Sequence, residues 1–549
     1  MSVLHLDGSL ITRDVDGVTA DMAATAAEAV GVCVRPLLRT VTDRATGSTV
    51  AVPIACGSTR ASVCPSCADK ARRLRMHQCR EGWHLTDDPL PPQPDHGDEG
   101  DIDGDTEGDT DMSPDEEADR RVRSTRRRDD VPDLPTVAAE HCSVGRTFTD
   151  ERTGRTFRPS MFITGTLGSY GLVRPYEGVP RHPARYDYRR AALDALMFPK
   201  LVDRTIQNLR RCAGYKVQYF GAVEAQRRLA PHLHLAIRGT IPRAVVRQVF
   251  AATYVSVWWP PIDRVVYSET DPDHWPLWTG EEAGYVDPHT GEPLPSWEQA
   301  LDQLDTQGDD GTPFHTMGWG TQVDIKGLIG GTPDSDRAVR YLCKYLTKSI
   351  AETYATTPDS LDHADQQARD RAARYEAHID HLHDHTRVLP CSPACANWLR
   401  YGIQPKNPTP GLHPGHCAAK AHDRECLGVG GRRALVSRHW TGKTLSEHKA
   451  DRATVVRQVL QDAGIEPPDA DRLAADVLHD DGKPRFVWED TRPDKRDYVA
   501  IIATSMRQAR QWRTQYDEAK VLVSRAKSPP EGPVDSRSAM ERGAGSWAS

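Results

Sequence analysis

The stretch YKVQYFGAVEAQRRLAPHLHLAIRG, residues 215–239, decides the fold. Its first part, Tyr215–Ala225, is rich in β-forming residues, and its second part, Pro231–Gly239, alternates polar and apolar residues as a half-buried strand does. Further strands are expected at Met161–Leu167 and Trp319–Leu328, and helices at about residues 188–212, 242–254 and 334–350. This order of elements predicts an α+β fold, in which an antiparallel sheet carries flanking helices.

Two histidines lie close together within the second of these strands. Residues i and i+2 of a strand point to the same face, so His232 and His234 present neighbouring imidazoles. If residues 225–231 form a hairpin loop, Glu224 on the preceding strand is the natural third ligand. Such a set could hold one divalent metal with an open coordination side. A pair of histidines without a metal is the alternative.

Two tyrosines follow about a hundred residues later, in RYLCKYLTKS. On a helix, residues i and i+4 share a face, so Tyr341 and Tyr345 project together and Lys344 and Lys348 form a second pair. A tyrosine hydroxyl can attack a phosphodiester and form a covalent link, given a nearby metal and a cation. Paired tyrosines that only pack against a core or groove are the alternative.

The ordered set FITGTL, PHLHL and YLCKYLTK resembles the three motifs of HUH endonucleases, which initiate rolling-circle replication. The resemblance implies an antiparallel sheet with flanking helices and a catalytic Mg²⁺ or Mn²⁺ held by His232, His234 and, with less weight, Glu224. It also implies Tyr341 and Tyr345 as nucleophiles that become linked to the 5′ phosphate. Lys344 would contact the phosphate or the transition state.

The N-terminal cysteines predict a structural zinc site. Cys64 and Cys67 form a Cys-x₂-Cys knuckle, and Cys56 with the distant Cys33 could complete a tetrahedral thiolate site. Cys79 and His77 compete for the distal places, and buried cysteines without a metal remain the alternative.

A second cluster of cysteines and histidines follows the tyrosine motif. It offers more ligands than one zinc ion needs, and the favoured set is Cys391, Cys395, Cys417 and Cys426, with His422 as the main competitor. The His-rich stretch before it, His378–Arg387, is interpreted as an exposed amphipathic helical face rather than another metal site.

Most of the chain resembles one narrower family. CPSCADKARR, AVEAQRRLAPHLHLAIRG, RYLCKYLTKS, CANWLRYGIQP and LGVGGRRALVSRHWTGKTLSEHKADR, in this order, are similar to the RepSA-type replication initiators of actinobacterial conjugative plasmids. The last segment contains Gly-Lys-Thr without the spacing of a phosphate-binding loop, so it is interpreted as DNA-contacting. The expected DNA contacts are Lys348, Arg238, Trp440 and Lys443.

Charge is distributed unevenly. Residues 87–119 hold fifteen acidic residues and no Lys or Arg, so the remainder of a chain with net charge −8 carries +7. The longer stretch from Asp87 to Val131 lacks aromatic residues and is predicted to be a disordered linker. No apolar run is long enough for a membrane span, and the N-terminus has no secretory signal. Membrane, collagen-like and secreted disulfide-scaffold proteins are therefore excluded, and a reducing cytoplasm is expected.

These segments divide the chain as follows. The expected parts are an N-terminal zinc-ribbon-like module (1–85), a linker (86–140), the nuclease domain (141–355, with an insertion at about 260–314), a helix with the second zinc module (356–430), a basic helical region (431–527) and a disordered tail (528–549).

The expected function is a plasmid replication initiator that nicks one strand of its own origin DNA through a tyrosine and later rejoins it. A host helicase and a host polymerase are implied partners, because no helicase motif occurs. The alternative is a zinc-containing DNA-binding regulator without nuclease activity. A relaxase of the same superfamily is disfavoured, because relaxases often place the tyrosine before the histidines.

Overall fold

The computed structural model describes residues 3–4, 10–11, 19–83, 85, 128–136, 148–149, 151, 154, 156–157, 159–306, 313–329, 332–344, 346–347, 366–431, 433–462, 478–479, 481–491 and 495–527. Almost all of the expected acidic linker and the whole expected tail lie outside these residues. The chain folds into two units. One comprises Met1–Gly57, Cys64–Cys67 and Ser446–Ser549, and the other comprises Ser58–Val63 and Ala68–Leu445.

The larger unit is built on a six-stranded sheet in which every neighbouring pair is antiparallel. The strands in their order across the sheet are β10 (Tyr254–Val257), β13 (His315–Ile329), β7 (Pro159–Leu167), β9 (Pro231–Arg238), β8 (Tyr219–Ala225) and β14 (Ala434–Val436). A mixed α+β architecture with an antiparallel sheet was predicted, and this coarse fold class is confirmed. The four central strands start and end within a few residues of their expected bounds.

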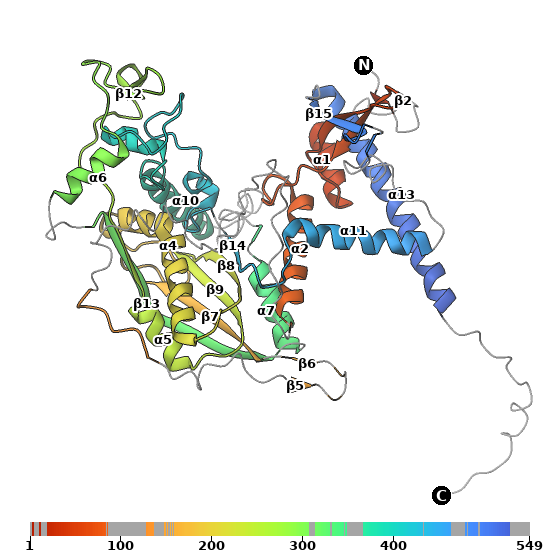
Figure 1. Ribbon diagram of the computed structural model, residues 1–549, viewed down its shortest axis with the longest axis horizontal. Helices are drawn as coiled ribbons and strands as arrows, with labels where there is room; N and C mark the ends of the chain where they lie inside the picture. Colours follow the sequence, from red (N-terminus) through yellow and green to blue (C-terminus); the bar gives the residue numbers. More distant parts are fainter. Residues whose placement is uncertain are drawn as a thin grey trace, which may run out of the picture. The chain divides into compact units, whose positions relative to one another are not determined.

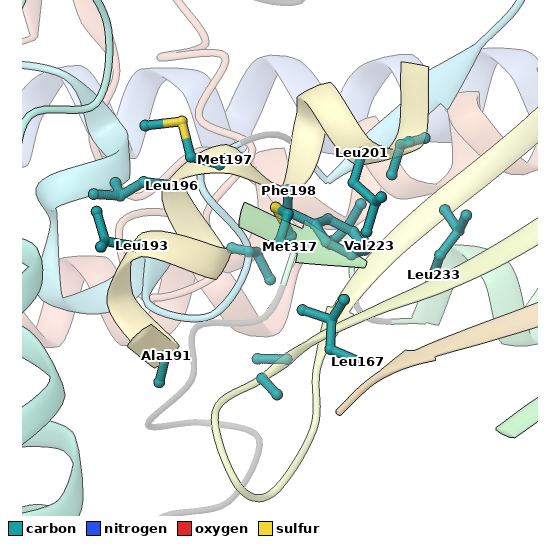
Figure 2. Close-up of a cluster of buried hydrophobic side chains, with 14 of the residues drawn as sticks. Leu167, Ala191, Leu193, Leu196, Met197, Phe198, Leu201, Val223, Leu233 and Met317 are labelled. Atoms are coloured by element: carbon teal, nitrogen blue, oxygen red, sulfur yellow. The ribbon is translucent and has the colours of Figure 1, made fainter. Parts of the chain in front are cut away.

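One face of the sheet packs on helices α4 (Tyr188–Ala213) and α5 (Arg243–Ala252) (Figure 1). The N-cap of α4 is Asp187, whose carboxylate accepts from the Arg190 amide, and its C-cap is Gly214 in the left-handed conformation that suits glycine. Figure 2 shows Leu167, Val223 and Leu233 of three adjacent strands next to Phe198 and Leu201 of α4. Burying these apolar side chains, at about 25 cal/mol per Å², is the main force that holds helix and sheet together.

The opposite face carries a smaller core. Helix α7 (Pro333–Lys344) and the part of α2 (Pro65–Trp83) from Ala68 onward cover it, and their buried residues Leu342, Cys343 and Trp83 pack with Phe220 and Trp440. Beside this core, toward the end of β8 and the start of β9, the same face carries the polar residues described below.

The larger unit contains further elements. They are the β-ladders β5–β6 (Phe148–Thr149, Thr156–Phe157) and β11–β12 (Leu277–Trp278, Tyr285–Val286), helices α6 (Trp297–Asp305) and α10 (Gln366–Thr386), and the 3₁₀ turns η3 (Pro183–Arg185), η4 (Pro272–His274), η6 (Ala396–Tyr401), η7 (Lys420–His422) and η8 (Arg424–Cys426). Helix α10 packs on α4. Its His378 is buried, and Nδ1 of this residue forms a hydrogen bond of 3.0 Å with the Tyr188 hydroxyl. The expectation of an exposed His-rich face is therefore wrong at His378.

The smaller unit is built from segments near the two ends of the chain. Its three-stranded sheet has the order β15 (Phe486–Thr491), β3 (Leu37–Asp43) and β4 (Thr49–Ile54). Helix α1 (Ala20–Ala29) packs on α13 (Lys495–Lys527) through a small core that includes Ala27 and Ile502. The unit also holds β1 (Val3–Leu4), β2 (Leu10–Ile11) and α11 (Leu445–Asp462) from Ser446 onward. Among the described residues of the whole chain, no helix is long and apolar enough to cross a membrane.

Candidate active site

Three adjacent strands bring the histidine pair and its neighbours into two rows on one face of the sheet. In the first row, Thr166 of β7, His232 of β9 and Glu224 of β8 lie directly opposite one another. In the second row, Thr164 is opposite His234. Because side chains alternate along each strand, all five point to the face that α4 and α5 leave open.

The structure places Glu224 in contact with the histidines. Its Oε2 lies 3.0 Å from Nε2 of His234, and both side chains are buried. The ring of His232 is the next neighbour, with its centroid 4.6 Å from that of His234. The three residues are thus adjacent, although their ligand atoms do not converge as closely as those of the cysteine clusters described below.

Two threonines and a glutamine, which the sequence analysis did not single out, contact the other nitrogen of each imidazole. Thr164 Oγ1 is 3.3 Å from Nδ1 of His234, and Thr166 Oγ1 is 3.1 Å from Nδ1 of His232. Gln226 Nε2 lies 3.3 Å from the same Nδ1 of His232. The Thr-x-Thr spacing in FITGTL was the available signal, because it has the same period of two as His-x-His. With Nδ1 engaged in this way, Nε2 is the atom of each ring that a metal would use, and in His234 it is the atom that contacts Glu224.

Burial sets the charge state of His232. Removal from solvent, with smaller contributions from the neighbouring His234 and Arg228, lowers the pKa of His232 to about 3. The imidazole is therefore neutral at neutral pH, and a neutral imidazole has the lone pair that a metal ligand needs.

Helix α7 brings a tyrosine to this set. The hydroxyl of Tyr341 lies 3.4 Å from Nε2 of His234, and its ring packs edge-on against His234 and Phe162. The Tyr341 residue is nevertheless 41% exposed. Lys344 is exposed in the last turn of the helix. Tyr345 and Lys348 lie outside the described residues.

Two of the expected DNA contacts lie in the core instead. Arg238 is 1% exposed and Trp440 is fully buried. The guanidinium of Arg238 donates to the carbonyl oxygens of Trp440 (2.7 Å) and His439 (3.1 Å) and lies over the Trp440 ring. This pair therefore holds the chain after β14 against the sheet, and the expectation of DNA contact is corrected for both. Lys443 is partly exposed and pairs with Glu81 at 2.9 Å.

The four N-terminal cysteines that were expected to bind zinc come together in the smaller unit. The sulfur atoms of Cys33, Cys56, Cys64 and Cys67 all lie within 4.8 Å of one another. A hydrogen bond from Cys67 and the backbone N–H of Cys56 help to lower the pKa of Cys33 to about 5. Four close sulfur atoms, one already favouring the thiolate, form a donor set that could hold zinc.

The second cluster differs from the expected set at one position. Cys391, Cys395, Cys417 and His422 have ligand atoms within 4.8 Å of one another. His422 Nδ1 donates to the Thr386 carbonyl oxygen at 2.7 Å, which leaves Nε2 facing Cys395 Sγ at 3.7 Å. Cys426 is buried but does not join this cluster. The fourth ligand is therefore corrected from Cys426 to His422, and this set too could hold zinc.

The larger unit thus combines an antiparallel sheet, a buried histidine pair with a carboxylate, and a tyrosine on a neighbouring helix. The family model described as RepSA, replication initiator protein, pSAM2, matches residues 19–508. The chain belongs to this family of plasmid replication initiators. No curated protein and no solved structure matches the chain.

Proposed function

We propose that this protein is a single-strand DNA endonuclease that nicks the origin of its own plasmid through Tyr341 and so starts rolling-circle replication. The observation that carries the proposal is the position of the Tyr341 hydroxyl, 3.4 Å from Nε2 of His234 and next to the His234–Glu224 pair. A helix tyrosine packed for structural reasons alone would not need its hydroxyl at a buried imidazole that contacts a carboxylate.

The donor set fits a divalent metal. Two imidazole nitrogens and one carboxylate oxygen are available, His232 is neutral, and the Nδ1 atoms of both rings are already engaged. His232, His234 and Glu224 would hold Mg²⁺ or Mn²⁺, which would polarise a non-bridging oxygen of the scissile phosphate. The same donors also suit zinc or iron. The choice of a hard ion rests on the phosphate oxygen of the substrate.

The covalent step conserves the number of phosphoester bonds. The Tyr341 oxygen forms a bond to phosphorus and loses its proton, while the bond from phosphorus to the 3′ oxygen breaks and that oxygen gains a proton. The products are a 5′-phosphotyrosine and a free 3′ hydroxyl. Because the link retains the ester, rejoining needs no ATP, and a second tyrosine, expected at Tyr345, can attack after one round of displacement. Lys344 would contact the phosphate.

The wider role follows from this chemistry. A free 3′ hydroxyl is a primer, so a host polymerase would extend it, and a host helicase would open the duplex ahead. Lysine and arginine contacts to phosphates would supply affinity for the origin, with a strong dependence on salt.

The decisive experiment looks for the covalent adduct. The purified protein is incubated with supercoiled plasmid that carries its own gene and flanking DNA, with Mn²⁺, and the products are separated on denaturing gels and analysed by mass spectrometry. We expect a DNA-linked peptide containing Tyr341 or Tyr345, lost with a chelator. Tyr341→Phe should reduce or redirect this adduct, whereas Tyr516→Phe, a change far along the chain in α13, should not.

The alternative is a zinc-containing DNA-binding regulator, in which the histidines and tyrosines have structural roles only. It predicts origin binding without any adduct, and replication in the cell that survives replacement of both tyrosines by phenylalanine. Origin binding with no adduct, while a known nickase is active in the same buffer, would refute the proposed nuclease.

A further inference from the structure

A short hairpin between β7 and α4 displays two hydrophobic side chains to solvent. Tyr176 is 92% exposed and Leu172 is 72% exposed, the highest values for large hydrophobic residues in the described part of the chain. Single exposed hydrophobic residues are common on protein surfaces. Tyr176 and Leu172 differ from such residues in the structure and charge of the hairpin that carries them.

The hairpin is rigidly built. Its two arms exchange backbone hydrogen bonds, from the Arg174 amide to the Val179 carbonyl and from the Arg181 amide to the Leu172 carbonyl, both 2.8 Å. Tyr176 itself has a φ of 62°, a left-handed conformation that a residue with a bulky side chain rarely adopts. A strained residue of this kind persists only where its surroundings hold it, and such residues cluster at functional sites.

Two arginines from other elements hold the tip in place. Arg227 donates from its side chain to the Tyr176 carbonyl oxygen. Arg374 of α10 pairs with Glu177 at 3.1 Å. The backbone of the tip is thus fixed on two sides while the Tyr176 ring stays uncovered, so little conformational freedom would be lost if that ring bound something.

The tip is also joined to the candidate active site. Arg227 lies in the loop between β8 and β9, and its neighbour Gln226 reaches Nδ1 of His232 at 3.3 Å. In the same loop, Arg228 donates to the carbonyl oxygens of Leu167 and Gly168 at the end of β7. The hairpin therefore rests on the loop that links the two strands carrying His232 and Glu224.

The charge around the ring favours a nucleic acid. Residues 168–190 contain five arginines and two acidic residues. Arg174, Arg181 and Arg185 are exposed, and among the described residues none of the three forms an ion pair. An exposed aromatic ring flanked by unneutralised cations matches a base with its phosphates, because every base has a face for stacking and every phosphate attracts a cation.

We infer that hairpin 172–181 binds single-stranded DNA beside the active site, with Tyr176 stacked on one unpaired base and Arg174 and Arg181 on flanking phosphates. The inference rests on the proposed function, which requires an unpaired strand at the histidine pair. In this inference the hairpin holds the unpaired strand. The inference does not depend on which tyrosine forms the covalent link.

The test measures affinity without chemistry. Full-length protein is titrated, in buffer without added Mg²⁺ or Mn²⁺, into fluorescein-labelled dT20 and into a labelled 20-base-pair duplex, and anisotropy gives Kd. Tyr176→Ser should weaken dT20 binding about fivefold to a hundredfold, the range that loss of one base stack implies, and change duplex binding much less. Tyr176→Trp should restore it.

Two further variants check the reasoning. Leu277→Ser, which alters another exposed hydrophobic residue in β11, is the matched control and should bind dT20 as the wild type does. The Arg174→Gln/Arg181→Gln double variant should lower the slope of log Kd against log salt by about 1.4, because each phosphate contact to a single strand contributes about 0.7. Cross-linking to an oligonucleotide with 5-iodouracil should attach a peptide containing Tyr176.

The outcomes separate this inference from the proposed function. Wild-type affinity of Tyr176→Ser for dT20, or an equal loss for duplex and single strand, overturns the inference, and adduct formation at Tyr341 would leave the nuclease intact. Conversely, Tyr176-dependent binding of dT20 by a protein that never forms an adduct would support the inference and refute the nuclease.

Discussion

Replacing the threonines behind the histidine pair should weaken metal binding without unfolding the protein. Thr164→Val and Thr166→Val keep the β-branched shape and remove only the hydroxyl. A metal on Nε2 requires that Nδ1 carry the ring proton, and the threonine oxygen then accepts that proton's hydrogen bond. Without the acceptor, the ring can rotate or change tautomer, and the ligand becomes less basic.

The size of the effect follows from which partner of each ring can accept the hydrogen bond of the Nδ1 proton. Loss of an outer hydrogen-bond partner costs about tenfold to a hundredfold in metal affinity. Nδ1 of His232 contacts Thr166 at 3.1 Å and Gln226 at 3.3 Å, but the Gln226 atom is the amide Nε2, which can only donate. Thr166 is therefore the acceptor of the Nδ1 proton, and Thr166→Val should lose about tenfold to a hundredfold. Thr164 at 3.3 Å is the corresponding acceptor for His234 Nδ1, so Thr164→Val should lose affinity in the same range of about tenfold to a hundredfold.

Mn²⁺ binding provides the assay. Isothermal titration of zinc-loaded protein, with free Mn²⁺ followed by electron paramagnetic resonance, gives the affinity of the additional site. Thr164→Ser and Thr166→Ser keep the hydroxyl and should bind Mn²⁺ nearly as the wild type does. Wild-type affinity for Mn²⁺ in both valine variants, or serine variants that lose as much affinity as the valine ones, would show that the threonine hydroxyls do not support the metal site.

Three other predictions concern the rest of the molecule. His422→Ala should remove about one zinc ion per chain by mass spectrometry while Cys426→Ala retains the wild-type content, and the opposite result would restore Cys426 as a ligand. Trp440→Ala should cost about 3–5 kcal/mol of stability in urea unfolding, as loss of a buried aromatic does; an unchanged midpoint would contradict its place in the core. Burial lowers the pKa of His378 in the folded protein to about 4, whereas the ordinary value is 6.5. Between these two pH values His378 is therefore protonated in the unfolded chain but not in the folded one. Stability should therefore fall between pH 6.5 and 4, by about 2 kcal/mol at pH 5 from this group, and a pH dependence in His378→Gln as steep as that of the wild type would refute this.

The candidate site was readable from sequence where its signals are local. The alternation in PHLHL predicts two imidazoles on one face, and a tight hairpin places Glu224 across from them, as the observed register does. The same period of two in FITGTL indicates that Thr164 and Thr166 share a face. It does not say that β7 lies beside β9, which is a property of the whole sheet.

Contacts between distant segments left no such signal. Strand β15 pairs with β3, although the paired residues Asp490 and Arg39 are 451 residues apart. The sequence of a short strand of ordinary composition does not indicate which other strand it pairs with. Trp440 lies in a basic segment, and for this reason DNA contact was predicted. It packs instead against Trp83, which belongs to a helix far away in the sequence. Charge counted along the chain cannot show which side chain of a segment turns inward.

The position of the proposed nucleophile is set by its buried neighbours rather than by the proposed metal ligands. Val339, Leu342 and Cys343 of α7 are buried in the smaller core, at the spacing that forms one apolar stripe of a helix. Burial of this stripe fixes the rotation of α7 about its axis, and that rotation directs Tyr341, the residue before Leu342, toward His234. Hydrogen bonding at 3.4 Å is too weak to orient a helix, whereas three buried apolar side chains can, at roughly 1–3 kcal/mol each. The two halves of the sheet face would therefore have different roles: the apolar half positions the tyrosine, and the polar half carries the groups that would hold the metal beside it.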